Sequence, residues 1–213
     1  MAITCTNFDT WLTQWHEQIY KFTLMLSLNE KTAKELTFQA YLRLGAANPG
    51  MDEAQARGAL YKAAFGVSRA YQQKKLRRSP SKKQLHKVCG KDMPEAFRTY
   101  LHSSFLSRAA VYLVHIAQFT PDEAGSILAV RPSKIRRLAS ITDINAIAAG
   151  CAAIKQSGDS LPSLSDRLYM RFSERSVAFE TKMIDFKQRF DNIVPYLALA
   201  VLILCIIALI ITQ

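Results

Sequence analysis

The stretch "FTPDEAGSILAVRPSKIRRL", residues 119–138, predicts two short helices joined by a tight turn. Thr120 is placed to cap the first helix, Pro121 suits its first position, and Glu123 completes a capping box. Pro132 can start the second helix after a turn at residues 129–131. The residues expected to point inward are Ala124, Ile127 and Leu128 on the first helix and Ile135 and Leu138 on the second.

Basic and polar side chains crowd the second of these helices. Two helices joined by a tight turn, the second one basic, have the geometry of a helix-turn-helix that docks in the major groove of DNA. Many helical hairpins carry surface lysines, so a solvated surface is the alternative. The candidate DNA contacts are Arg131, Ser133, Lys134, Arg136 and Arg137.

The positive charge of the chain is concentrated in one segment. The 213 residues carry a formal net charge of +11, and residues 54–91 hold eleven Lys and Arg but no Asp or Glu. The positive and negative charges nearly cancel in residues 1–53 and again in residues 92–213. Such a segment favours a polyanionic partner, either nucleic acid or an acidic lipid surface. A solvated basic loop is the alternative interpretation.

The chemistry-bearing residues give little support to an enzyme. The four cysteines are widely scattered, without a C-x-x-C pair, which indicates a reducing compartment rather than a disulfide framework or a zinc site. The sequence has no Gly-rich phosphate loop, no metal-ligand cluster and no Ser/His/Asp grouping at a defensible spacing. We therefore expect no catalytic residue, no bound metal and no cofactor.

The C-terminal end predicts a membrane anchor. From Ile193 to Thr212 the chain has no charged residue, and about 20 apolar residues match a hydrocarbon core roughly 30 Å thick. Lys187 and Arg189 precede this stretch, so the positive-inside tendency keeps the N-terminal part in the cytoplasm. The N-terminus lacks the pattern of a signal peptide. The expected topology is a single pass through the cytoplasmic membrane, with a buried core helix as the alternative.

Elsewhere the apolar residues recur at helical spacing, which predicts an all-α fold. Asp52 with Gln55 forms a second capping-box signature, at the start of a third helix. The expected inward positions are Phe8, Trp11, Leu12, Trp15, Ile19, Phe22 and Leu26, then Ala33, Leu36, Ala40 and Leu44, then Leu60, Ala64, Val67 and Tyr71. A last seam suits a partner helix, the membrane surface or packing on the rest of the protein: Leu168, Phe172, Ser176, Phe179, Met183, Phe186 and Phe190.

Three segments, taken in order, resemble a known family. They are "AKELTFQAYLRL" (33–44), "LYKAAFGVSRAYQQKKLRR" (60–78) and "RAAVYLVHIAQFTPDEAGSILAVRPSKIRRL" (108–138). This collinear series, over about residues 8–140, resembles a bacterial RNA polymerase sigma factor of the extracytoplasmic-function type. The resemblance implies two small helical domains joined by a linker. The first domain would bind the polymerase clamp and the −10 promoter element, and the second would read the −35 element.

The resemblance also implies roles for individual residues. Polymerase binding would fall to Glu35, Gln39 and Arg43. Contacts with the −10 element would fall to Lys62, Arg69, Lys74, Lys75, Arg77 and Arg78, and those with the −35 element to the five helix-turn-helix residues named above. The expected partners are RNA polymerase core, promoter DNA, the membrane, and a membrane-bound regulator or protease.

The expected organisation has six parts. They are a sigma region 2-like helical domain (1–79), a basic linker (80–92), a region 4-like helix-turn-helix domain (93–140), a small-residue helix and linker (141–165), a juxtamembrane amphipathic helix (166–191) and the transmembrane anchor (192–213). The predicted function is that of a membrane-tethered sigma factor in transcription initiation.

Two other functions stay open. One is a membrane-anchored helix-turn-helix regulator that does not use polymerase, because Phe38 and Gln39 stand where the family usually has Gln and an acidic residue. The other is a membrane-bound adaptor whose basic segment faces acidic lipid headgroups.

Overall fold

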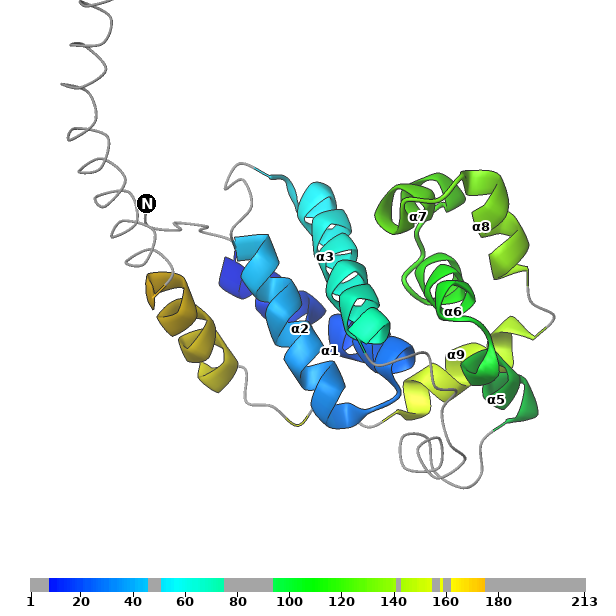
Figure 1. Ribbon diagram of the computed structural model, residues 1–213, viewed down its shortest axis with the longest axis horizontal. Coiled ribbons are helices and arrows are strands. Elements are labelled where there is room, and N and C mark those ends of the chain that lie inside the picture. The colour runs from blue at the N-terminus through cyan, green and yellow to red at the C-terminus, as the bar shows by residue number, and fades with distance from the viewer. Residues whose placement is uncertain are drawn as a thin grey trace, which may run out of the picture. The chain divides into compact units, whose positions relative to one another are not determined.

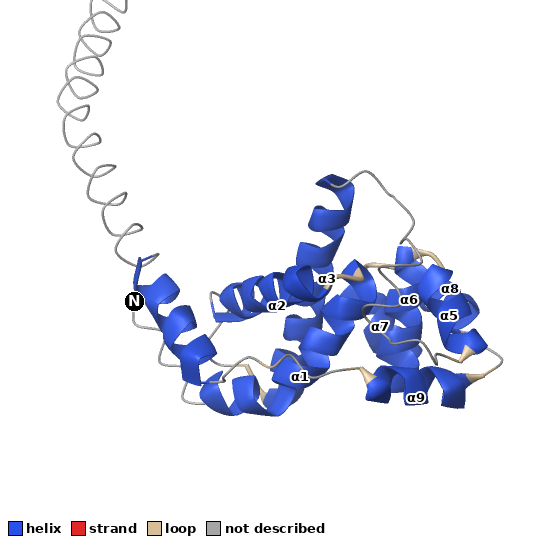
Figure 2. Ribbon diagram, turned by 90° about the horizontal axis from the view of Figure 1, so that it is seen from below, coloured by secondary structure: helices blue, strands red, loops and turns tan. Residues whose placement is uncertain are grey.

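In a computed structural model, the described residues are 8–45, 51–74, 94–140, 143–154, 158 and 162–174. Every regular element in these ranges is helical, which confirms the all-α prediction (Figure 2). The chain divides into two compact units, the first formed by Ile3–Tyr169 and the second by Met1–Ala2 with Met170–Gln213.

Among its described residues, the first unit contains three long helices and then six short ones, and a further helix begins at residue 162 (Figure 1). The long ones are α1 (Phe8–Ser27), α2 (Glu30–Gly45) and α3 (Glu53–Lys74). The short ones are α5 (Glu95–His102), α6 (Phe105–Val111), the π-helix η1 (Tyr112–Ile116), α7 (Pro121–Leu128), α8 (Pro132–Ala139) and α9 (Ile144–Ala153).

Helix α1 lies at the centre of this unit and packs against α2, α3 and α6. Its predicted apolar seam is buried throughout, and near its C-terminal end Leu24, Met25 and Leu26 are all buried in succession. Over the earlier turns the opposite side of α1 is exposed at Thr10, Thr13, Gln14 and Gln18, so the helix is amphipathic there and is buried all round only near its C-terminal end. The predicted inward positions on α2 and α3 are buried as well, except Tyr71, which is half-buried.

The second capping box is also present, at the N-terminus of α3. The Gln55 N–H donates to Asp52 Oδ1 at 2.7 Å, and the Asp52 N–H is 3.4 Å from Gln55 Oε1. These bonds satisfy amide groups that the first turn of a helix leaves without a partner.

Arg108 of α6 joins helices that are distant in the sequence. Its side chain is 5% exposed, and burial lowers the pKa of its guanidinium from the ordinary value. It donates to the carbonyl oxygens of Met25 (2.9 Å) and Leu26 (3.3 Å) in the last turn of α1. It also donates to Leu101 O (3.0 Å) and Ser103 O (2.7 Å) at the end of α5. The charge therefore lies between the negative ends of two helix dipoles, where it is favoured.

The segments predicted as domains 1–79 and 93–140 both contribute helices to this single unit. Helix α3 packs against α7, and α1 packs against α6. The division into two domains stays a prediction.

Two C-terminal expectations fall wholly or partly outside the described residues. No described helix is long and apolar enough to cross a membrane, and the predicted anchor at 192–213 is not among the described residues. Residues 162–174 are helical, so this helix starts before the expected boundary at 166. Within the second unit, Arg171 Nη1 lies 2.8 Å from Glu174 Oε2 in an exposed ion pair.

Replacing Arg108 with Lys is expected to lower the free energy of unfolding by about 2–4 kcal/mol. Lys keeps the charge, but its single ammonium cannot reach four carbonyl oxygens that the guanidinium fork reaches in two directions. Arg98→Lys is the matched control, since Arg98 is exposed on α5. This substitution should alter the free energy of unfolding by no more than about 0.5 kcal/mol. Chemical denaturation followed by circular dichroism measures both, and equal losses for the two variants would contradict the prediction.

Candidate nucleic-acid interface

The first helix of the predicted pair begins as the sequence indicates. The Glu123 N–H donates to Thr120 Oγ1 at 3.3 Å, and the Thr120 N–H donates to Glu123 Oε2 at 2.8 Å. The Thr120 hydroxyl also donates to the same carboxylate at 2.8 Å. These bonds, first the one from the backbone and then the one from the hydroxyl, hold the pKa of Glu123 below its ordinary value. The capping box thus fixes where α7 starts.

The turn between α7 and α8 depends on a left-handed residue. Ala129 has φ 54° and ψ 48°, a conformation that glycine adopts at lower cost than alanine. The N–H groups of Ala129 and Val130 both point to Gly125 O, with Val130 N at 2.9 Å. A Cβ on Gly125 would lie 2.7 Å from Val130 O. The turn closes this tightly because residue 125 has no side chain.

Helix α8 presents the predicted DNA contacts to solvent. Ile135 and Ala139 are buried and Leu138 is half-buried, so one side of the helix packs on the unit. At 100° per residue, Ser133 and Arg137 lie within about 40° of each other on the opposite side, with Lys134 and Arg136 on either flank. The five predicted residues are all exposed: Arg131, Ser133, Lys134, Arg136 and Arg137.

The basic side chains of α8 are accessible to a ligand. Arg136 Nη2 lies 3.9 Å from Asp122 Oδ2, and the two side chains are 65% and 71% exposed. An exposed ion pair of this kind contributes little to stability and is easily exchanged for another anion. Arg131 occupies the N-cap position of α8 without a side-chain capping bond.

The C-terminal end of α8 is fixed to the preceding helices. Ser107 Oγ donates to Leu138 O at 3.3 Å, and His115 Nε2 lies 2.7 Å from Ala139 O. A carbonyl oxygen can only accept, so Nε2 of His115 carries the proton. These two bonds set the direction in which α8 projects from α6 and η1.

The predicted −10 contacts are described only in part. Lys62 and Arg69 are exposed on α3 and lie seven residues, or two turns, apart on one stripe of the helix. Lys74 is the last residue of α3. Lys75, Arg77 and Arg78 lie outside the described residues. The structure therefore does not test whether the whole set lies on the same surface as α8.

The predicted polymerase contacts share one face of α2. Gln39 Nε2 donates to Glu35 Oε1 at 2.8 Å, and Arg43 follows four residues later on the same face. Arg43 is exposed, but its guanidinium lies against α3, where a Cβ on Gly66 would be 3.1 Å from Nη1. The three side chains therefore form one row along α2.

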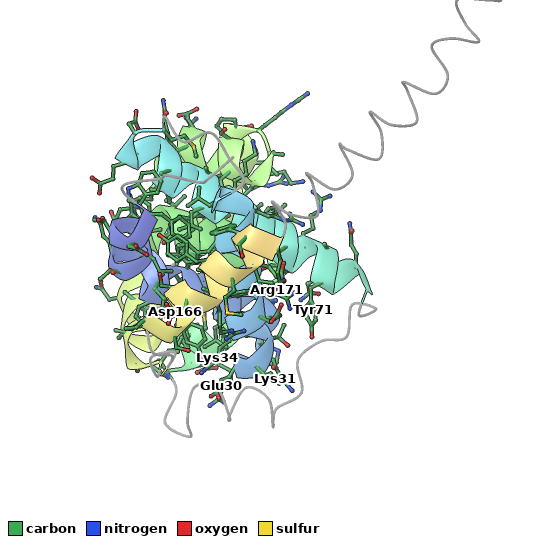
Figure 3. The ribbon with its side chains drawn as sticks, turned by 90° about the vertical axis from the view of Figure 1, so that its left-hand side faces the viewer. Glu30, Lys31, Lys34, Tyr71, Asp166 and Arg171 are labelled. Carbon is green, nitrogen blue, oxygen red and sulfur yellow. The ribbon has the colours of Figure 1, made fainter. Side chains whose placement is uncertain are left out.

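The neighbouring side of α2 is covered by the chain itself. Phe38 is buried, and the Arg167 guanidinium lies 4.9 Å from the centre of its ring. Figure 3 shows the helix that carries Asp166 passing in front of α2, whose first turns carry Glu30, Lys31 and Lys34. Asp9 at the start of α1 accepts from Ser165 Oγ (2.8 Å) and Tyr169 Oη (3.0 Å). Residues 162–169 thus belong to the packed body of the first unit.

Several structural residues were not singled out from the sequence. Arg57 donates to Ala117 O and lies 4.5 Å from the centre of the Phe119 ring, so it fixes α3 to the loop before α7. Similar bonds to main-chain carbonyl oxygens are made by Ser107, Arg108 and His115. Every residue has such a carbonyl, so the sequence does not reveal these acceptors. The one available signal was that a basic residue, Arg108, opens an apolar helical stretch.

The described residues contain no cluster of three or more His, Cys, Asp or Glu side chains that could hold a metal ion. On α8, four basic side chains and Ser133 are exposed together on one side of the described structure.

Two substitutions in the turn are expected to shift stability in opposite directions. Ala129→Gly should raise the free energy of unfolding by about 0.5–1 kcal/mol, since it removes the left-handed strain. Gly125→Ala should lower it by about 1–3 kcal/mol, because a backbone oxygen opposes the new Cβ more strongly than helix propensity favours it. Thermal unfolding of both variants checks the pair. Stabilisation by both would show that the turn is not as tight as described.

Comparisons of this chain with models of protein families, with curated proteins and with solved structures found no match.

Proposed function

We propose that this protein is a membrane-tethered, sigma factor-like DNA-binding protein that directs RNA polymerase to promoters. Helix α8 would lie in the major groove, and α7 would cross the backbone behind it. The Glu35, Gln39 and Arg43 row on α2 would bind polymerase core. The C-terminal apolar stretch would hold the protein at the cytoplasmic membrane, where a regulator or protease would act on it.

One observation carries the DNA-binding part of the proposal. Helix α8 is buried on one side through Ile135 and Ala139 and exposes a basic face on the other. Both of its ends are fixed, by the tight turn at Ala129 and by the bonds from Ser107 and His115. A rigid helix with Arg and Lys on its free face is suited to phosphate contacts and to bidentate guanine contacts.

The DNA-binding part predicts a specific loss for Arg137→Ala. Because Arg137 is near the centre of the exposed face, affinity for DNA should fall by about tenfold to a hundredfold, as for loss of a base contact. Lys134→Ala, on the flank, should weaken binding to all sequences and lower the salt slope by about one. Fluorescence anisotropy with full-length protein in mild detergent, over a series of salt concentrations, measures both.

Arg98→Ala on α5 is the matched control for the same charge loss, and its affinity should stay within about twofold. An equal loss for Arg98→Ala and Arg137→Ala would assign the binding to net charge rather than to α8. No binding to DNA at all would remove this function and leave the lipid-facing adaptor.

A second candidate is a membrane-anchored regulator that reads DNA without polymerase. The observation that favours it is the burial of Phe38 under Arg167. Residues 162–169 thereby occupy the side of α2 next to the predicted polymerase-binding row, which narrows the surface open to a large partner.

Association with polymerase core separates the two candidates. Under the sigma factor proposal, immobilised full-length protein retains core enzyme, and Glu35→Lys weakens retention by about tenfold or more. Glu95→Lys is the matched charge reversal on α5, where Glu95 is exposed, and it should retain core enzyme normally, since α5 lies outside the row. DNA binding without retention of core enzyme would contradict the first candidate and support the second.

A further inference from the structure

The helices α1–α3 and α5–α8 are connected by buried polar bonds as well as by apolar packing. Arg108 donates to Met25 O and Leu26 O at the end of α1. Tyr112 Oη donates to Gln18 O in the middle of α1 at 2.9 Å. Burial raises the pKa of Tyr112 well above its ordinary value, so the phenol stays protonated and remains a donor.

A continuous series of aromatic rings crosses the same boundary. Phe22 of α1 is fully buried, and its ring centre lies 5.3 Å from that of Tyr61 and 5.2 Å from that of Tyr112. Tyr61 in turn contacts Phe119 at 5.1 Å in an edge-to-face arrangement. Phe65 stacks on Phe105 at 5.5 Å. Buried aromatic pairs add roughly 0.5–1.5 kcal/mol each beyond the area that they bury.

These contacts are of the kind found within a domain core rather than between loosely docked domains. Interfaces between domains that move apart are more polar and smaller than a core. Here the boundary contains fully buried rings and a buried arginine whose four acceptors lie on both sides. Separating the two sets of helices would leave these groups without partners, which costs several kcal/mol.

We infer that α1–α3 and α5–α8 form one interlocked body that engages DNA as a unit, at a single contiguous site read by α8. The inference rests on the DNA binding proposed above. A compact unit with the length of Ile3–Tyr169 has a radius of gyration of about 15 Å and a diameter of about 40 Å. At 3.4 Å per base pair, that diameter spans about 12 base pairs. The exposed Lys62 and Arg69 of α3 can then reach only phosphates close to the α8 site.

Selection from random duplexes tests the contiguous site. Full-length protein in mild detergent is used to enrich duplexes whose random segment is several times longer than about 12 base pairs. Hydroxyl-radical footprinting of the enriched duplexes follows. The expected result is one protected block of about 12 base pairs for each bound copy, including an inverted repeat when two copies bind.

Two different blocks at a fixed spacing of more than about 12 base pairs, protected by one copy, would overturn the inference and leave DNA binding intact. No enrichment would overturn the proposed function itself. The number of copies is measured by native mass spectrometry of the complex.

Hydrogen exchange tests the interlocked body without DNA. Thr37 of α2 shares a buried hydrogen bond with Thr23 of α1 at 2.9 Å, and both lie far from α8 in the sequence. In one cooperative body, Thr37→Ala accelerates the slowest amides of α6 by the same factor as those of α1, about fivefold to tenfold. Thr13→Ala is the control, because Thr13 is exposed on α1 and should leave both rates unchanged. Acceleration confined to α1–α3 would overturn the inference.

Discussion

The buried guanidinium of Arg108 is the interaction on which the arrangement of the first unit depends. A charge that is 5% exposed is tolerable only if its donors find acceptors with good geometry. The acceptors are main-chain carbonyls at the ends of α1 and α5, where a helix leaves such groups without an internal partner. One side chain therefore satisfies two helix ends and fixes the angle between them. Because α6 carries Arg108, these bonds fix α6 against the ends of α1 and α5.

The tyrosines extend the same principle into the apolar core. Burial raises the pKa values of Tyr41, Tyr61, Tyr100 and Tyr112 above their ordinary values. Each hydroxyl is consequently a neutral donor over the whole physiological range. Tyr100 donates to Arg108 O at 3.1 Å and Tyr112 to Gln18 O. Such bonds to the main chain select one packing of the rings among the many that apolar contact alone would allow.

The local features of this fold could be read from the sequence, and the long-range ones could not. Helical periodicity predicted the seam of α1, and Thr120 with Glu123 predicted the start of α7, because both signals depend on residues a few positions apart. The exposure of Arg137 followed from the same periodicity. Arg108 and Arg57 find their acceptors 83 and 60 residues away, and those acceptors carry no sequence signature. The docking of α3 on α7 was equally hidden, since a linker reveals nothing about how the helices that it joins will pack.

The π-helix η1 makes the number of residues before α7 critical for the structure. Its closing bond runs from Ala117 N to Tyr112 O at 2.8 Å, one residue further than in an α-helix. Tyr112 faces Gln18 on one side of this turn, and His115 faces the end of α8 on the other. Loss of a single residue here would restore an ordinary helical turn and rotate all that follows by about 100°. Relatives of this protein should therefore keep the residue number of η1 constant, because an insertion or deletion here would move Tyr112 and His115 out of register with their acceptors.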